Sequence, residues 1–369
     1  MQSPVAYIDL RAVEENATRL LDRVKPRGLL AVVKWNAYGH GLIECAMALD
    51  QVGAAGFGVS SPQEGVQLRK AGITKPILVM TDWVGKPPKL FIDWNLEAAA
   101  TSWYKVEYLA AISRNWGYSI PAHIKFDTGL GRVGLPHAKS QELLKKIASM
   151  KHLQIAAIYS HLDYAGPQDR AKGARQIKVF NRIVEEAAAL GIQPRWIHLA
   201  NSAAALALPD IPGNLVRSGI ALYGQPPSRE AAQLLPLKPV MTLAGSIVST
   251  TRLIKGQGYP SSLFFKAPVN GWGAEVNLGC STGYPSSIGG QAPVLWRGRR
   301  VKLIRAISDE NSFIFVTKER PEVGEEVVFW GRQGDETLFL HELSPLIKCL
   351  PYELPTWLSP QLSRQYLHS

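Results

Sequence analysis

The chain has 369 residues, of which 46% are hydrophobic and 19% charged, a balance typical of a soluble globular protein. No apolar run approaches the ~18 residues of a membrane-spanning helix, and the opening MQSPVAYIDL lacks the basic flank and long apolar core of a signal peptide. The net charge of +11 comes from basic residues spread along the chain without a block of like charges, so nucleic-acid binding is weakly supported and we expect none.

Residues 1–232 alternate short apolar runs with helical patterns. The expected strands are Val5–Ile8, Leu29–Val33, Gly56–Val59, Ile77–Met80, Glu97–Ala100, His123–Phe126, Gln154–Tyr159, Trp196–Leu199 and Leu215–Ile220. The expected helices between them include 11–24, 43–52, 63–70, 104–113, 140–149 and 176–189, and Ser61-Pro62-Gln63-Glu64 resembles a capped helix start. Eight or nine strand–helix units favour an α/β fold with a closed parallel (β/α)8 TIM-like barrel over an open sheet.

Residues 233–369 have a different sequence pattern, in which apolar runs are separated by turns rich in Gly, Pro and Ser. The expected strands there are Val240–Thr251, Ala274–Leu278, Val294–Ile307, Phe313–Val316 and Val327–Trp330. They predict a second, mostly antiparallel, barrel-like β domain, with the Pro-rich stretch near 225–240 as linker. Two domains also fit the length, because single cores stop growing near ~250–300 residues.

The three cysteines, Cys45, Cys280 and Cys349, are odd in number and widely separated. No pair has the spacing of metal ligands, and a disulfide framework is implausible. We therefore expect no metal site and a cytoplasmic location.

Lys34 stands where the apolar run 29–33 meets the polar segment WNAYGHG. Desolvation at such a strand end lowers the pKa of an amine, and a neutral amine can attack a carbonyl to form a Schiff base. A single lysine at a strand end more often extends into solvent. The residues around Lys34 are therefore needed to distinguish a reactive amine from an exposed one. Polar segments follow other strands as well: DTGLGR, SHLDYAG, ANSAA and RSGIALYG. In a parallel barrel they meet at the carboxyl ends of the strands, where active sites lie.

The segment AVVKWNAYGHG (31–41) resembles the cofactor-lysine signature of alanine racemases, which are pyridoxal-phosphate enzymes with an N-terminal α/β barrel and a C-terminal β domain. The resemblance continues in order over nearly the whole chain. The further motifs are HIKFDTG (123–129), GRVG (131–134), SH (160–161), HLANSA (198–203), VRSGIALYG (216–224) and PYEL (351–354).

The resemblance implies a homodimeric isomerase that interconverts L- and D-alanine, with active sites shared by both chains. Lys34 would carry pyridoxal 5′-phosphate as a Schiff base and serve as one acid/base group. The other implied cofactor contacts are Tyr38, Ser202, the amides of Gly219 and Ile220, and Tyr352 at the phosphate, Arg217 at the pyridine nitrogen, and His161 and Asn201 in the pocket. The implied substrate contacts are Arg132, Lys125 (often carbamylated in the family, where it orients the arginine) and Asp309.

The sequence departs from the family pattern in the second domain. The tyrosine that acts as second acid/base is replaced, in an ungapped comparison, by Ser261, while Tyr259 lies two residues away. Cys280 and Ser286 replace a tyrosine and an arginine, and Asp309 stands in place of a methionine. Three hypotheses follow: a racemase of the alanine racemase type, a one-base enzyme of the same fold (aldolase, decarboxylase or transaminase type), or an inactive or partner-dependent paralogue.

Overall fold

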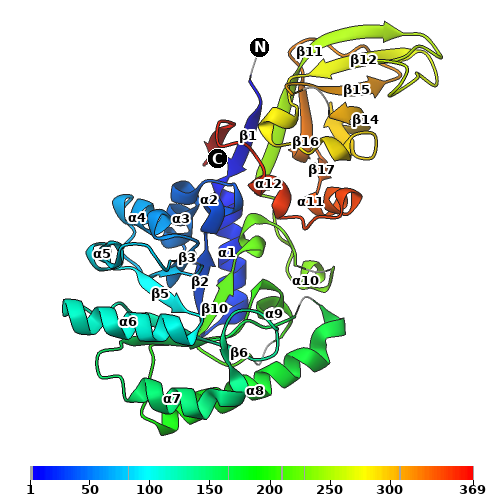
Figure 1. The fold of residues 1–369 in the computed structure, drawn as a ribbon. Helices are drawn as coiled ribbons and strands as arrows, with labels where there is room; N and C mark the ends of the chain where they lie inside the picture. Colours follow the sequence, from blue (N-terminus) through cyan, green and yellow to red (C-terminus); the bar gives the residue numbers. More distant parts are fainter. Residues whose placement is uncertain are drawn as a thin grey trace. The chain divides into compact units, whose positions relative to one another are not determined.

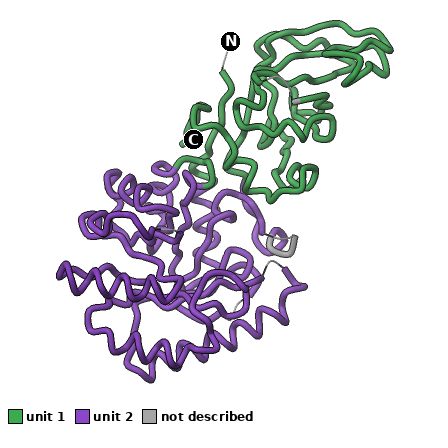
Figure 2. Tube along the Cα trace, viewed as in Figure 1, with its two compact units in different colours: residues 1–12, 38–41, 239–369 green, residues 13–37, 42–238 purple. Residues whose placement is uncertain are grey.

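The structure is a computed structural model that describes residues 3–81, 83–164, 166–208, 211–227, 229–306 and 309–368. The chain divides into two compact units (Figure 2). Unit 1 comprises residues 1–12, 38–41 and 239–369, and unit 2 comprises residues 13–37 and 42–238. Each unit is built on one sheet and is described separately.

Unit 2 contains a parallel barrel of eight strands. They are β2 (Gly28–Val32), β3 (Gly56–Val59), β4 (Ile77–Val79), β5 (Glu97–Ala100), β6 (Ala122–Asp127), β8 (Ile155–Tyr159), β9 (Trp196–His198) and β10 (Leu215–Ser218), in the order β10-β2-β3-β4-β5-β6-β8-β9. Backbone hydrogen bonds from Asn214 N to Ile197 O (3.0 Å) and from Arg217 N to Ala200 O (3.1 Å) connect β9 to β10. The predicted barrel is therefore confirmed.

Helices follow the strands and lie outside them (Figure 1). They are α1 (Leu10–Val24), α3 (Leu42–Gln51), α4 (Pro62–Lys70), α5 (Pro88–Asp93), α6 (Trp103–Trp116), α7 (Ser140–Ala148), α8 (Arg170–Ala189), α9 (Ser202–Ala207) and α10 (Arg229–Leu234). The predicted cap of α4 is confirmed: Ser61 Oγ accepts a hydrogen bond from Glu64 N at 3.3 Å, and Pro62 occupies the first turn. No helix among the described residues is long and apolar enough to cross a membrane.

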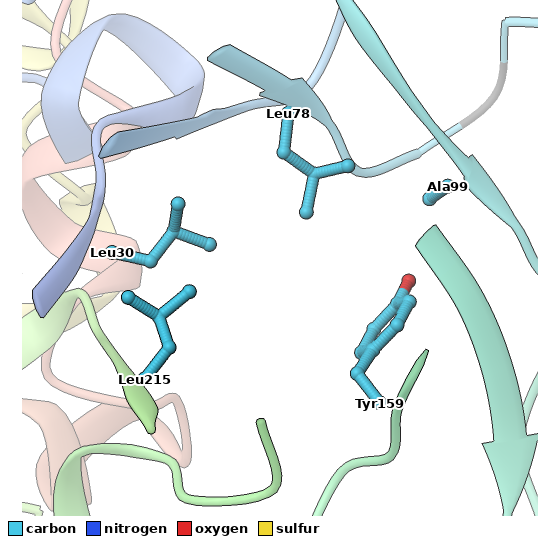
Figure 3. Packing of buried hydrophobic residues seen from close by; sticks show 5 residues of the cluster. All are labelled: Leu30, Leu78, Ala99, Tyr159 and Leu215. Carbon is cyan, nitrogen blue, oxygen red and sulfur yellow. The ribbon is translucent and has the colours of Figure 1, made fainter. Parts of the chain in front are cut away.

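The barrel interior is filled by side chains rather than open. Leu30, Leu78, Ala99, Tyr159 and Leu215, from five different strands, point toward one another there, and each is at most 3% exposed (Figure 3). Such a layer makes the barrel a rigid core, so that the polar groups at the strand ends are held on a fixed frame.

Unit 1 contains a nine-stranded, mostly antiparallel sheet in the order β17-β16-β13-β14-β15-β12-β11-β1-β18, and β16 also pairs with β11. Its strands are β1 (Val5–Asp9), β11 (Met241–Leu253), β12 (Gly271–Val276), β13 (Pro293–Trp296), β14 (Arg299–Ala306), β15 (Ser312–Val316), β16 (Glu326–Gln333), β17 (Glu336–Leu338) and β18 (Ser363–Leu367). The pairing of β16 with both β11 and β13 curls the sheet into the predicted barrel-like form.

Two expectations are corrected by this topology. Val5–Ile8, expected as the first strand of the parallel barrel, instead pairs antiparallel with β11 and parallel with β18. The single run expected over 294–307 is two strands, β13 and β14, because Arg297 and Gly298 both have positive φ (49° and 66°) and make a tight hairpin. Ile307 itself lies outside the described residues.

Candidate active site

The structure brings most of the predicted site residues of unit 2 to the carboxyl ends of the barrel strands. Lys34 follows β2, Lys125 lies near the end of β6, and Arg217 lies in β10. The remaining members of this set are Arg132 after β6, His161 after β8, Asn201 and Ser202 after β9, and Gly219 and Ile220 after β10. Because all eight strands are parallel, these segments meet at one end of the barrel.

The backbone after Lys34 makes a left-handed helical turn. Trp35, Asn36, Ala37 and Tyr38 all have φ between 52° and 55°, within the short element α2 (Lys34–Tyr38). The conformation is costly for residues other than glycine, so it persists only where other contacts hold it. Ala37 N donates to Val33 O at 2.8 Å, which ties the turn to the end of β2.

Side chains also hold this turn. Asn36 Oδ1 accepts a hydrogen bond from Leu42 N at 2.8 Å, and Asn36 N donates to Glu64 Oε1 at 3.2 Å. Glu64 Oε2 accepts from Ser60 N (2.7 Å) and Ser60 Oγ (2.5 Å). The Lys34 Nζ lies 4.0 Å from the centroid of the Trp35 ring. Lys34 is therefore presented by a turn whose shape is fixed from α4 and the loop before it.

Four cationic side chains lie at this end of the barrel: Lys34, Lys125, Arg132 and Arg217. Burial lowers the pKa of Lys34, and the charge of Arg132 lowers it further while Glu64 opposes both. Burial, Arg132 and Arg217 likewise lower the pKa of Lys125 to about 8. The pKa of His161 falls well below its usual value through burial and through the charges of Arg217, Arg132, Lys125 and Lys34. Lys34 and Lys125 thus carry amines that lose their protons more readily than usual.

Arg217 is buried, with 3% of its surface exposed. Its Nη2 donates to Ser160 O at 2.7 Å and to Leu199 O at 3.2 Å, and its Nη1 lies 2.6 Å from His198 Nδ1. The guanidinium carbon lies 5.4 Å from the centroid of the Tyr159 ring. Burial lowers the pKa of Arg217 to about 10, so the guanidinium is still charged at neutral pH.

Ser202 stands where the ends of β9 and β10 meet. Its Oγ lies 3.0 Å from Ser218 Oγ and accepts a hydrogen bond from Gly219 N at 3.2 Å. Hydroxyl and amide donors grouped in this way can bind a phosphate, and glycine lets the backbone approach the anion closely. Asn201 next to it has an evident structural task, because its Oδ1 caps α9 at Ala204 N (2.9 Å) and its Nδ2 donates to Leu162 O (3.0 Å).

The loop that carries Arg132 is shaped by Asp127. One oxygen, Asp127 Oδ1, accepts hydrogen bonds from the amides of Gly129 (3.0 Å), Leu130 (2.9 Å) and Gly131 (3.3 Å). Asp127 is therefore a turn former, an interpretation that the DTG pattern already allowed. Arg132 itself is exposed.

The other predicted site residues belong to unit 1. Tyr38 and Tyr352 contact each other edge to face, with ring centroids 5.9 Å apart. Tyr259 packs edge to face on Phe313 (5.5 Å), and burial together with the charge of Glu275 raises its pKa.

Ser261 and Asp309, also in unit 1, are held by backbone contacts. Ser261 Oγ accepts from Leu263 N at 3.3 Å. Asp309 is exposed, and its carbonyl accepts from Ser281 N at 2.8 Å.

Sequence reasoning did not identify the residues that form hydrogen bonds to the site residues or to their neighbours. Glu97, His123 and His198 are each at most 6% exposed and form hydrogen bonds inside the barrel, and Glu64 holds the turn after Lys34. A signal existed for Glu97, because it is a charged residue at the start of an otherwise apolar barrel strand (EAAA). The described residues contain no cluster of three or more His, Cys, Asp or Glu side chains arranged to hold a metal.

Two family models match the chain. The model described as alanine racemase, N-terminal domain, matches residues 8–227, and the model described as alanine racemase, C-terminal domain, matches residues 240–366. The chain belongs to the alanine racemase family. Relatives with this name include the alanine racemase of Geobacter sulfurreducens, which is 34% identical over 99% of this chain and 97% of its own length.

Solved structures of the family agree over the full length of the chain. The alanine racemase from D-cycloserine-producing Streptomyces lavendulae has a TM-score of 0.93 and 30% identity, covering 100% of this chain and 98% of its own. The alanine racemase from Bartonella henselae, which contains covalently bound pyridoxal phosphate, has a TM-score of 0.88 and 26% identity and covers 100% of both chains. The resemblance seen in the sequence motifs is thereby confirmed.

The residues at the barrel end fit pyridoxal phosphate, the cofactor on which this family depends. Within the described parts of the chain, no carboxylate lies within ion-pairing distance of Lys125, Arg132 or Arg217. An anionic cofactor and the carboxylate of an amino acid would both be attracted to this excess of positive charge. Lys34 supplies the amine, and Ser202 with Gly219 N supplies polar groups suited to a phosphate.

Proposed function

We propose that this chain catalyses the racemisation of alanine with pyridoxal phosphate held by Lys34. The observation that carries the proposal is the convergence of Lys34, Lys125, Arg132 and Arg217 on one barrel end, where no carboxylate of the described residues forms an ion pair with the last three. This arrangement suits a dianionic phosphate ester and an amino-acid carboxylate. The racemase function is also supported by the relatives, all of whose quoted names are those of alanine racemases.

When bound, pyridoxal phosphate makes the Cα–H bond of an attached amino acid acidic. Lys34 would hold the cofactor through Nζ and then move a proton to or from one face of Cα. Ser202, Gly219 N and Ile220 N would bind the phosphate, and Tyr38 and Tyr352 are further predicted cofactor contacts. Arginine has only donors, so Arg217 would keep the ring nitrogen unprotonated and disfavour side reactions that need a long-lived carbanion.

The same proposal assigns substrate contacts. Arg132 would bind the substrate carboxylate through its guanidinium, for which the planar fork of donors is suited. Lys125, whose pKa is lowered to about 8, would be a site of carbamylation and in that form would orient Arg132. Asp309, His161 and Asn201 remain predicted contacts of substrate or pocket. The predicted division assigns cofactor binding to residues 1–232 and a supporting β domain to residues 233–369.

The second acid/base would come from the segment that holds Tyr259 and Ser261. Tyr259 is the better proton carrier of the two, because a phenol can be tuned and a lone serine hydroxyl lacks a partner base. Burial and the charge of Glu275 raise the pKa of Tyr259, so its phenol is protonated at neutral pH and can act first as a proton donor. Tyr259→Phe should abolish racemisation if Tyr259 is the second base, whereas Ser261→Ala should reduce it only modestly. The opposite ranking of the two variants would assign the role to Ser261.

Cofactor attachment is tested by absorbance and chemical trapping. The purified chain should show the Schiff-base absorbance band, and borohydride should fix the cofactor covalently on the peptide that contains Lys34. Lys34→Ala should lose the label, and Lys70→Ala, a matched change on α4, should keep it. Label on another lysine would refute the assignment.

The reaction type is tested with L-alanine in deuterated water. A racemase that uses two bases should release D-alanine carrying deuterium at Cα. Deuterated L-alanine without D-alanine would establish one-sided chemistry and contradict the racemase proposal. The one-base and inactive hypotheses predict that outcome or no exchange, and the comparisons do not favour them.

We also propose a homodimer and a cytoplasmic location. The connection between β11 and β12 exposes apolar side chains, with Leu263 88% and Ile254 63% exposed, as expected of a surface that another chain covers. The three cysteines are free thiols, which fits a reducing compartment. Leu263→Glu should shift the mass measured by light scattering toward a monomer, whereas a wild-type chain that is already monomeric would contradict the dimer.

A further inference from the structure

Hydrogen bonds run in series through the barrel interior from Arg217 to Arg195. Arg217 Nη1 lies 2.6 Å from His198 Nδ1, and His198 Nε2 lies 3.2 Å from His123 Nδ1. His123 Nε2 lies 2.6 Å from Glu97 Oε2, and Glu97 Oε1 lies 2.5 Å from Arg195 Nη2. Each of the four imidazole nitrogens therefore has one partner in this series.

The series joins the two ends of the barrel. Arg217 lies in β10 at the end that carries the candidate site, whereas Glu97 is the first residue of β5 and Arg195 immediately precedes β9. A cavity of about 440 Å³ at this opposite end is lined by Glu97, Arg195 and polar residues such as Asn95 and Gln154. Glu97, His123, His198 and Arg217 are at most 6% exposed, while the Arg195 side chain is 48% exposed.

Arg217 and Glu97, at the two ends of the series, determine which nitrogen of each histidine carries the proton. Arginine can only donate, so as long as Arg217 Nη1 stays beside His198 Nδ1 that nitrogen accepts, and the proton of neutral His198 is on Nε2. That Nε2–H then donates to His123 Nδ1, and His123 in turn carries its proton on Nε2 and donates to Glu97. A carboxylate can accept from both His123 and Arg195. All donors thus point in one direction, from Arg217 toward Glu97.

We propose that Glu97 is a positioning residue for racemisation: it holds both histidines in the Nε2–H tautomer, so that His198 Nδ1 accepts from Arg217 and fixes its guanidinium. The inference rests on the proposed function only in assigning Arg217 to the cofactor. Without an acceptor at position 97, a tautomer change of His123 and then His198 would turn an N–H of His198 toward the N–H groups of Arg217. The guanidinium would have to move away from that contact.

The surroundings agree with two neutral imidazoles and an ionised Glu97. The Tyr159 ring stacks on His198, with centroids 4.7 Å apart, and meets His123 edge-on at 6.2 Å. Burial and the charge of Arg217 lower the pKa of His198, and burial outweighs the influence of Glu97 on His123. For Glu97, burial is outweighed by the hydrogen bond with His123 and by Arg195, so its pKa lies below the usual value.

Nitrogen-15 NMR of histidine in the full chain, as purified, tests the tautomers directly. The eight histidines can be reduced to the two of interest by comparison with His123→Gln and His198→Gln. We expect a pyridine-type Nδ1 and a pyrrole-type Nε2 on both rings, unchanged from pH 6 to pH 9. A protonated Nδ1 on either ring of the wild-type chain would overturn the proposal, and this reading needs neither a variant at Glu97 nor racemase activity.

Variants then distinguish a role of Glu97 as hydrogen-bond acceptor from a purely structural role. Glu97→Ala should show a tautomer change or new titration of His123 and His198, while Glu97→Gln, whose amide oxygen can still accept, should keep the wild-type pattern. Glu186→Ala is the matched control, because Glu186 pairs with Ser140 Oγ outside the barrel interior. Unchanged spectra in Glu97→Ala, or equal loss in the Ala and Gln variants, would overturn the proposal.

Kinetics provide the second measurement. The loss of a charge-assisted hydrogen bond at Arg217 should lower kcat roughly ten- to hundredfold in Glu97→Ala and change KM much less. Glu97→Gln should restore most of kcat. If the chain does not racemise alanine at all, the proposed function fails while the tautomer pattern remains measurable. If kcat falls with unchanged tautomers, the proposed function stands and the role of Glu97 is refuted.

Discussion

Removing the Glu64 carboxylate should loosen the left-handed turn after Lys34. Glu64 Oε1 accepts from Asn36 N, and Oε2 binds Ser60 through its amide and hydroxyl. In Glu64→Ala the hydrogen bonds from Ala37 N to Val33 O and from Leu42 N to Asn36 Oδ1 remain, but the contacts from α4 are lost. The amide of Asn36 loses its acceptor altogether.

The magnitude follows from the strain that the turn holds. Four consecutive residues other than glycine in this conformation cost roughly 1–2 kcal/mol each, so any lost contact favours opening. A hydrogen bond to a charged acceptor contributes about 1.5–3 kcal/mol. Because 1.4 kcal/mol is a factor of ten, amide exchange at Asn36 should accelerate roughly ten- to hundredfold in Glu64→Ala.

Hydrogen–deuterium exchange followed by NMR measures this local opening without requiring two-state unfolding of the whole chain. Glu64→Gln should give a smaller acceleration, because the amide oxygen still accepts. Glu142→Ala is the matched control, since that exposed carboxylate pairs with Lys146 on α7 and should leave Asn36 unchanged. An Asn36 exchange rate in Glu64→Ala within about twofold of wild type would refute the idea that Glu64 holds the turn.

Three further predictions concern stability. In protein whose Lys125 is not carbamylated, the pKa of the Lys125 amine is lowered to about 8 from 10.5, so the unfolded chain binds more protons between these pH values. The free energy of unfolding should therefore rise with pH there, and urea titrations of Lys125→Met should lack that rise. At Gly213 (φ +102°) a Cβ would lie 2.1 Å from Ile197 O, so Gly213→Ala should lose about 2–5 kcal/mol of the free energy of unfolding in thermal melts. Gly72 also has positive φ but open space around it, so Gly72→Ala should lose only about 1–2 kcal/mol. Arg69 donates to the carbonyls of Ile73, Lys75, Trp94 and Asn95, so Arg69→Met should lose about 2–4 kcal/mol, and an unchanged melting temperature would contradict that account.

The barrel could be predicted from sequence because most of its strands are short, largely apolar runs that alternate with helical patterns. The placement of β1 could not, because the run VAYI has the same local pattern whichever sheet it joins. Its partners lie more than 230 residues further along the chain, and one of them, β18, alternates between exposed and half-buried residues without an apolar run. In the β13–β14 turn only Gly298 carries a local signal, because two-residue hairpins with positive φ at both positions favour Asn-Gly, Asp-Gly or Gly-Gly, and Arg297 stands at the first position.

The candidate site divides in the same way. Lys34, Arg217 and Ser202 lie in motifs next to strand ends, so their meeting at one barrel end follows from the fold. Glu97 and Glu64 act through spatial neighbours that are not adjacent in the sequence, His123 for one and Asn36 for the other. The left-handed turn itself carries no sequence signal, because three of its four members, Trp35, Ala37 and Tyr38, rarely adopt positive φ.

The position of β1 between β11 and β18 has a consequence for synthesis of the chain. The ribosome makes β1 before any barrel strand, yet both of its partners emerge only after the barrel is complete. Throughout that interval β1 has two unpaired edges, which are templates for pairing with another nascent chain. A chain that ends near residue 238 would keep this exposed strand permanently, so a truncated barrel should aggregate unless residues 1–9 are also removed. Although β1 is translated before every other strand, it is thus among the last to form its strand pairs.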